Sequence, residues 1–193
     1  MKVLVIFAHP VETSFCAALY KTTVETLKKA GHQVDACDLY AEDFNPVLSR
    51  EERVNYHDLE INQKAVESYV NRLNACEALV IVTPVWNFGY PAILKGFFDR
   101  VFLPGVSFEM VDKQVKTKLT HIKKLAVVTT YGGTRLRAFL VGDPPRTIAK
   151  RLLRASIGLA KPVSYLAQYD MNRISDATRA RFLAHVASHM ENF

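Results

Sequence analysis

The sequence is poor in cysteine and has no long apolar run. Its 193 residues contain three cysteines, Cys16, Cys37 and Cys76, and no C-x-x-C pair. An odd number at this spacing disfavours a disulfide framework and a cysteine zinc site, and free thiols suit a reducing cytosol. The longest stretch without a charged residue, 78–94, is interrupted by two prolines and a glycine. It is therefore too short and too broken to span a bilayer.

Two kinds of phosphate-binding loop are also missing. Neither G-x-G-x-x-G nor G-x-x-x-x-G-K-[ST] occurs, which disfavours a dinucleotide fingerprint and P-loop chemistry. With 8 glycines and 8 prolines the chain is not collagen-like or of low complexity. No small-residue cleavage site follows the apolar N-terminal run, so we interpret that run as a buried strand and expect a cytoplasmic protein.

The charge balance is basic without being concentrated. Lys and Arg number 25 against 19 Asp and Glu, a net charge of +6. Such an excess attracts nucleic acid, an anionic membrane or a phosphorylated small molecule, although a solvated basic surface explains it at least as well. No run of five like charges exists, so we expect no nucleic-acid partner and at most peripheral membrane contact. Hydrophobic residues at 49% and charged residues at 23% predict a globular chain, which we take as a single domain over 1–193.

Strand and helix patterns alternate along the chain. The apolar and β-branched segments that predict strands are 2–8, 33–39, 78–83, 124–130 and 162–167. The first predicted helix begins after Thr13 or Ser14 and ends at Gly31, and the last begins after Ser175 and ends near residue 190. Between them, helices are predicted over 60–75, 92–102 and 146–156. This alternation predicts an α/β fold, a doubly wound five-stranded parallel sheet of order 2-1-3-4-5 with helices on both faces. Ligands of such sheets bind at the carboxyl ends of the strands, which directs attention to three loops.

The first loop places polar groups at the start of a helix. His9, Thr13 and Ser14 follow the first strand, and the exposed N–H groups of a helix start bind anions. The arrangement suits one phosphate group. Taken alone, however, the loop is better explained by a plain helix cap at Thr13 or Ser14 beside a strand-end histidine.

The second and third loops suit a planar ligand. Trp86 and Phe88 lie among turn residues directly after a buried strand, where their rings can stack on a heterocycle and Asn87 can bond its edge. A satellite hydrophobic cluster is the alternative. After the fourth predicted strand, Gly132 and Gly133 allow close backbone approach by a ligand, or simply form a turn.

Long segments of the chain resemble a known family. The segment PVWNFGYPAILKGFFDRVFLPGVSFE, together with VLVIFAHPVETSF, CDLYAEDFNPVLSREE and VVTTYGG, is similar to the flavodoxin-like NAD(P)H:quinone oxidoreductases. That family includes DT-diaphorase and the ancillary flavoproteins of bacterial potassium-efflux systems. The similarity covers most of the first 133 residues in order and is weak beyond Gly133.

The resemblance implies an enzyme with a non-covalently bound flavin. NAD(P)H would reduce the flavin by hydride transfer and leave, and a quinone or related electrophile would then take the hydride, a two-electron ping-pong reaction. The segment after Arg53 is shorter than in the mammalian members, which favours FMN while leaving FAD open. Family members are typically homodimers with the flavin at the subunit interface.

The resemblance also assigns residues to the flavin. Its phosphate region would be held by His9, Thr13, Ser14 and Phe15. Its isoalloxazine ring would be lined by Pro84, Val85, Trp86, Asn87 and Phe88. Its far edge would be held by Thr129, Thr130, Tyr131, Gly132 and Gly133.

The substrate side departs from the family pattern. In the mammalian members a tyrosine and a histidine after the glycine pair assist hydride transfer, whereas this chain reads TRLRAFLVGDPPR there. Tyr131, which precedes the glycines, is our candidate catalytic residue. Arg135, Arg137 or Arg146 can meet the 2′-phosphate of NADPH, although a solvated arginine is the simpler reading for each.

Four other polar residues are predicted to lie on the protein surface without a functional role. We read Lys95 and Arg100 as solvent-facing helix residues. His185 and His189 are one helical turn apart but lack further ligands, so we predict surface histidines and no metal site.

Two other functions share the same fold and cofactor. One is a flavin-binding regulatory subunit of a membrane transporter. The other is a one-electron carrier of the flavodoxin type, which the net charge of +6 disfavours because such carriers are typically acidic.

Overall fold

Five parallel strands form the centre of the molecule. The computed structural model describes residues 1–193. Its main sheet consists of β1 (Lys2–Phe7), β2 (Gln33–Asp38), β3 (Ala78–Val85), β6 (Lys124–Tyr131) and β7 (Val163–Gln168). The strand order is β2-β1-β3-β6-β7 and every neighbouring pair is parallel. The predicted order 2-1-3-4-5 is confirmed, since β6 and β7 are the fourth and fifth strands of this sheet.

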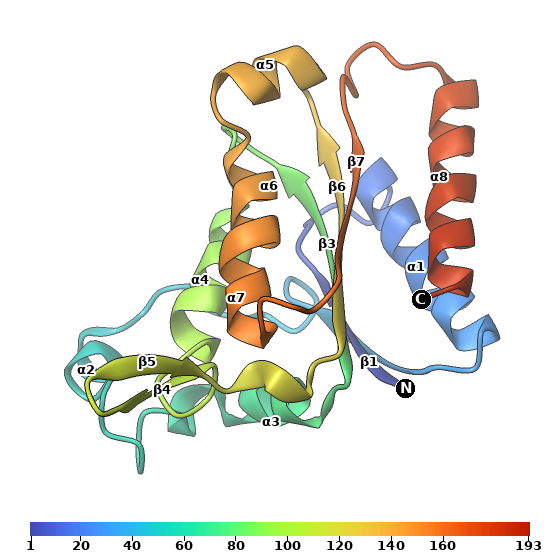
Figure 1. Ribbon diagram of the computed structural model, residues 1–193. Helices are drawn as coiled ribbons and strands as arrows, with labels where there is room; N and C mark the ends of the chain where they lie inside the picture. The colour runs from blue at the N-terminus through green and yellow to red at the C-terminus, as the bar shows by residue number, and fades with distance from the viewer.

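Helices cover both faces of the sheet (Figure 1). One face carries α1 (Phe15–Lys29) and α8 (Asp176–Glu191). The other carries α3 (Glu67–Ala75), α4 (Ala92–Val101) and α7 (Arg154–Ile157). None of the helices combines the length and apolarity that crossing a lipid bilayer requires.

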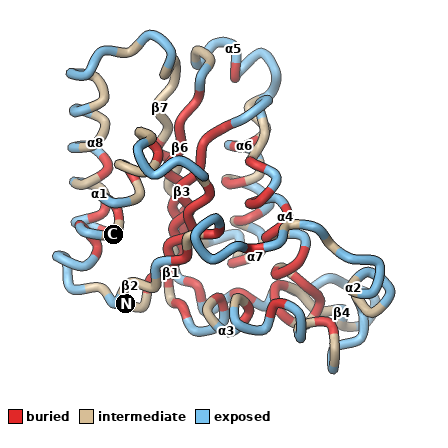
Figure 2. Tube along the Cα trace, turned by 180° about the vertical axis from the view of Figure 1, so that it is seen from behind, coloured by how far each residue is buried: buried red, intermediate tan, exposed pale blue.

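Alternating strand residues divide the core into two clusters. In β1, Leu4 and Ile6 pack on the side of α3 and α4, whereas Val3 and Val5 pack on the side of α1 and α8. The central strands are consequently apolar throughout, as expected of a sheet buried on both faces. Figure 2 shows this burial concentrated in the central strands, while α5 (Arg135–Leu140) is largely exposed.

Two predicted helix starts are confirmed by their caps. The Ser14 hydroxyl accepts the N–H of Ala17 at 3.1 Å and begins α1. Ser175 caps α8 in the same way, accepting the N–H of Thr178 at 3.3 Å. A side-chain oxygen thus satisfies one of the otherwise unpaired N–H groups in each first turn.

The segment 103–120, in which no strand or helix was predicted, contains a β-hairpin. Strands β4 (Phe108–Val111) and β5 (Gln114–Thr117) are antiparallel and project from the lower part of the molecule in Figure 1. Asp112 and Lys113 form the two-residue turn with φ of 51° and 64°. This left-handed pair is usually signalled by Asn-Gly or Asp-Gly, and the missing glycine hid the hairpin.

Several helix boundaries also differ from the prediction. A short helix, α2 (Arg50–Val54), lies between the predicted strand 33–39 and the predicted helix 60–75, and it begins with a Ser49–Glu52 capping box. The helix predicted over 60–75 begins only at Glu67, after the turn η1 (Lys64–Val66). The loop after Tyr131 contains α5. The helix predicted over 146–156 is composed of α6 (Pro144–Thr147), the π-helical η3 (Ile148–Leu153) and α7.

The contact between α4 and the segment before α2 explains two residues of PAILKGFFDRV. A Cβ on Gly96 would lie 2.2 Å from the Pro46 carbonyl oxygen, so only glycine fits there. Arg100, predicted to face solvent, is buried, pairs with Glu52 at 2.6 Å and donates to the Asn45 carbonyl. That prediction was wrong because helical spacing alone did not reveal the segment covering α4. Lys95 does face solvent, as predicted.

Candidate functional site

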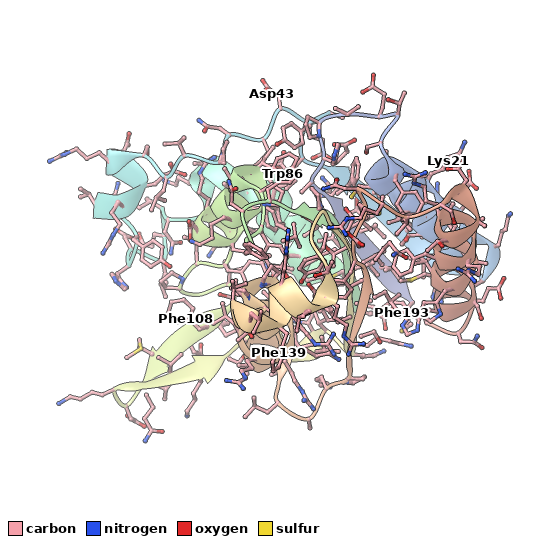
Figure 3. All side chains as sticks on the ribbon, turned by 90° about the horizontal axis from the view of Figure 1, so that it is seen from above. Lys21, Asp43, Trp86, Phe108, Phe139 and Phe193 are labelled. Atoms are coloured by element: carbon pink, nitrogen blue, oxygen red, sulfur yellow. The ribbon has the colours of Figure 1, made fainter.

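The loops after β1, β3 and β6 meet at one edge of the sheet. These three strands are neighbours, and the register pairs Phe7 with Val82 and Val85 with Tyr131. Because all three are parallel, their carboxyl ends lie at the same edge. Figure 3 looks down onto this edge, with Trp86 near its centre and Phe139 beside α5.

His9 connects the first loop to the second. Its imidazole lies 5.7 Å from the Trp86 ring in an edge-to-face arrangement. The Val11 N–H donates to Nδ1 at 3.0 Å, which places the proton of neutral His9 on Nε2. Burial lowers the pKa of His9 below its ordinary value, so the ring is neutral at pH 7 and presents Nε2–H as a donor.

The first turn of α1 has no negative side chain to balance its helix dipole. The partial positive charge of the helix start is therefore not compensated within that turn. Thr13 is exposed and Ser14 is half-buried. The Phe15 ring packs 6.5 Å from the Phe182 ring on α8, so Phe15 contributes its backbone N–H at this edge rather than its side chain.

The second loop is a strained tight turn that holds aromatic rings outside the core. Trp86 and Gly89 exchange backbone hydrogen bonds of 3.0 and 2.8 Å across it. Asn87 and Phe88, at its centre, have φ of 49° and 57°. A left-handed conformation is unfavourable for a bulky residue, and such strain often marks functional segments. Trp86 is 42% exposed and Phe88 39%, so neither ring belongs to the core.

A pocket of about 220 Å³ opens between the second and third loops. All six of its lining residues are among those the resemblance assigned to the flavin: Val85, Asn87, Phe88, Tyr131, Gly132 and Gly133. A Cβ placed on Gly133 would have no neighbour within 4 Å, so this wall faces open space. The residues before it at the ends of β3 and β6 are buried, namely Pro84, Thr129 and Thr130. The Thr129 hydroxyl has no hydrogen-bond partner.

Tyr131 lines this pocket, but its hydroxyl is hydrogen-bonded inside the protein. The ring is buried at 2% exposure and stacks on Tyr169 at 4.4 Å, and its hydroxyl donates to Asp143 at 2.6 Å and contacts the Tyr165 hydroxyl. Burial raises the pKa of Tyr131, and the neighbouring Tyr165 and Asp143 raise it further, so the phenol remains a donor at neutral pH. Its catalytic role stays a prediction, and the structure gives its hydroxyl internal partners instead of a free position at the pocket.

Sequence reasoning missed the partners of Tyr131. Asp143 is half-buried with φ of 42°, and its second carboxylate oxygen accepts from the Tyr169 hydroxyl at 3.2 Å. Tyr165 belongs to β7, which pairs with β6. No local signal announces this cluster, because three separate segments assemble it.

The family model for the flavodoxin-like fold matches residues 1–189. The chain belongs to the flavodoxin-like fold family. This agrees with the resemblance on which the site residues were assigned.

Individual relatives of this flavodoxin-like chain are oxidoreductases. It is 34% identical over 147 residues to NAD(P)H dehydrogenase [quinone] 1 of Rattus norvegicus. The matched region covers 68% of this chain and 54% of the rat protein. The chain is 30% identical over 142 residues to an FMN-dependent NADH:quinone oxidoreductase of Bacillus velezensis, covering 65% and 67%. An NAD(P)H:quinone oxidoreductase structure from Methanothermobacter marburgensis is 27% identical, with a TM-score of 0.85 and coverage of 100% and 98%. The chain spans about half the length of the mammalian relatives it matches.

The Tyr131 cluster predicts a stability effect. Tyr131→Phe removes the donor to a half-buried carboxylate, and we expect the free energy of unfolding to fall by about 1–3 kcal/mol. Urea unfolding measures it. Tyr20→Phe is the matched control, because that ring stacks on Phe7 at 4.4 Å and its hydroxyl makes no hydrogen bond. Equal losses in the two variants would contradict the hydrogen-bonding role of the Tyr131 hydroxyl.

Proposed function

We propose that this protein is a flavin-dependent NAD(P)H oxidoreductase that reduces quinones or related electrophiles. The observation that carries the proposal is the pocket between the second and third loops, whose six lining residues are all ones the resemblance assigned to the flavin. The named quinone oxidoreductases among its relatives support the same activity. The proposed reaction is a two-electron ping-pong exchange, in which the reduced donor leaves before the acceptor binds.

FMN is the flavin we propose. A relative that is FMN-dependent supports it, as does the single anion-binding helix end beside His9. The open wall at Gly133 and the exposed rings of Trp86 and Phe88 fit a planar ring at the sheet edge. When bound there, the flavin supplies the hydride-accepting and hydride-donating chemistry.

The residues of the chain bind and orient this group. The helix start at Ser14 and the neutral His9 donate toward the phosphate, whose negative charge the helix dipole favours. The tight turn fixes the indole of Trp86 against His9, which limits its rotation. Tyr131 contributes its backbone to the pocket wall, while its hydroxyl holds Asp143.

The three cysteines are all reduced and buried, which supports a cytoplasmic location.

We also propose a homodimer with the flavin site at its interface. An apolar groove of about 270 Å³ begins at Tyr90, two residues beyond Phe88, and runs between α4 and η3. Its apolar wall consists chiefly of Phe98, Phe102, Phe108, Ile148, Leu152 and Leu153. Leu152 is 62% exposed there, and a second subunit would cover it.

The activity is tested on the purified protein with FMN. We expect the visible absorption of oxidised flavin, its bleaching by NADPH or NADH without oxygen, and its return on addition of menadione, a naphthoquinone. Initial rates at varied donor and menadione concentrations should give parallel double-reciprocal plots, with kcat of about 1–1000 s⁻¹. Free FMN at the same concentration is the control. Flavin binding without turnover would contradict the enzyme and favour the regulatory-subunit alternative.

The pocket wall at Gly133 gives a test of flavin placement that needs no turnover. Gly133→Val fills the open space beside the backbone, so we expect the Kd for FMN, measured by quenching of flavin fluorescence, to rise at least about tenfold. Stability to urea should stay within about 0.5 kcal/mol, because no protein atom is displaced. Ala160→Val, at an exposed position remote from this edge, is the control. Unchanged FMN affinity would place the flavin elsewhere.

The dimer is tested by light scattering after size exclusion. We expect a molar mass of twice the 21.8 kDa of the chain. Leu152→Asp introduces a charge into the groove and should give the monomer. Leu159→Asp changes an equally exposed leucine outside the groove, at 73% exposure, and should remain dimeric. A monomeric wild-type protein would contradict the proposal.

A further inference from the structure

A second pocket lies beside the proposed flavin site. It has a volume of about 270 Å³ and is formed by α5, the turn before α6 and the end of β7. Its lining residues are Arg135, Phe139, Gly142, Asp143, Arg146, Thr147 and Tyr169. Arg135 and Arg146 are two of the three arginines that the sequence offers to the 2′-phosphate of NADPH, and the flavin site proposed above does not use this pocket.

The two pockets share a wall. Tyr131 lines the first pocket and donates to Asp143, which lines the second. Gly133 of the first pocket and Arg135 of the second are two residues apart, so their Cα atoms are separated by at most about 7.6 Å. The N–H of Asp170, next to Tyr169, donates to the Gly133 carbonyl at 2.8 Å and ties the end of β7 to the same wall.

The second pocket carries uncompensated positive charge. Arg135 and Arg146 are both exposed, and neither forms an ion pair. The single acidic side chain of the lining, Asp143, already accepts hydroxyls at both carboxylate oxygens. Burial lowers the pKa of Lys150 on η3, and the positive charges of Arg146 and Arg154 lower it further.

An exposed aromatic ring stands beside the arginines. Phe139 is 74% exposed on the solvent side of α5, and Tyr169 forms another part of the wall. The Arg146 guanidinium lies over the Tyr165 ring at 5.4 Å, and neither it nor the Arg135 guanidinium is paired with a carboxylate. The exposed phenylalanine and the two guanidinium groups together present an apolar face and anion-binding donors. That combination suits a ligand with a planar ring and a phosphate.

We propose that the Arg135–Arg146 pocket binds a phosphate group of the reduced nicotinamide dinucleotide, with Phe139 packing against its adenosine. The inference rests on the proposed oxidoreductase function and deepens it, since it assigns the donor a binding site outside the flavin pocket. Two phosphates of the donor share this chemistry, the 2′-phosphate that only NADPH carries and the pyrophosphate that both donors carry. Either is a group that guanidinium forks bind in bidentate fashion.

Kinetics with both donors test the pocket. Arg135→Gln and Arg146→Gln should each raise KM for the donor about tenfold, the effect of losing one charge-assisted hydrogen bond, and leave kcat within twofold. A rise for NADPH alone identifies the 2′-phosphate, and an equal rise for NADH identifies the pyrophosphate. The dependence of the donor KM on salt should weaken in both variants, which a merely structural change would not cause.

Arg137→Gln is the matched control for these variants. Arg137 is the third arginine that the sequence offers to the 2′-phosphate, but the structure does not place it in the pocket. It lies on the same helix as Arg135, is exposed and forms no ion pair. Its KM values should equal those of the wild type. Unchanged donor KM in the Arg135 and Arg146 variants, or an equal change in the Arg137 variant, would overturn the inference.

Direct binding separates this inference from the proposed function. Calorimetric titration with 2′,5′-ADP and with ADP measures phosphate binding without turnover, and the affinity of at least one should fall about tenfold in Arg146→Gln. Wild-type protein that binds neither would overturn the inference even if it reduces quinones. If neither donor reduces the flavin, the proposed function fails, while the titration still decides whether the pocket binds phosphate.

Discussion

The parallel ladder between β3 and β6 is the constraint on which the candidate site depends. It pairs Thr83 with Thr129 and Val85 with Tyr131, so both strands end at the same height. The tight turn after Val85 and the glycines after Tyr131 are thereby brought to opposite sides of one pocket. A slip of one residue would turn each strand's side chains to the other face and move these two walls apart. Burial on both faces prevents the slip, because it would exchange the two core clusters.

Most of the sheet was predictable because each strand carries its own signal. Apolar runs of strand length alternate with helical patterns, and only a few right-handed topologies satisfy that alternation. The errors lie where no local pattern exists. The turn at Asp112 and Lys113 lacks the glycine that announces a hairpin, and the ladder of four residue pairs around it is short. Arg100 lies on α4 where an exposed face was expected, yet the segment containing Pro46 folds over it.

The candidate site was predictable to the extent that its walls are backbone and loop residues. Loops after parallel strands reach the same edge whatever their side chains do, and the structure brings residues of the second and third loops to one pocket at that edge. Side-chain direction was not predictable. Tyr131 is the last residue of β6. The direction of its hydroxyl is set by Asp143, which accepts from it and lies in a left-handed turn twelve residues later. The arginine pocket likewise depends on how α5 and the end of β7 approach each other.

The Asp143 cluster couples the two pockets electrostatically. Burial raises the pKa of Tyr131 and of Tyr169, so both phenols keep their protons near neutral pH and both donate to the same carboxylate. The two hydroxyls donate to opposite oxygens of the Asp143 carboxylate and so fix its direction. The negative charge of Asp143 is therefore held on the wall between the pockets, while Arg135 and Arg146 leave the outer pocket positive. The outer pocket therefore attracts an anionic group from solvent, and the carboxylate of the wall opposes the passage of that group toward the inner pocket.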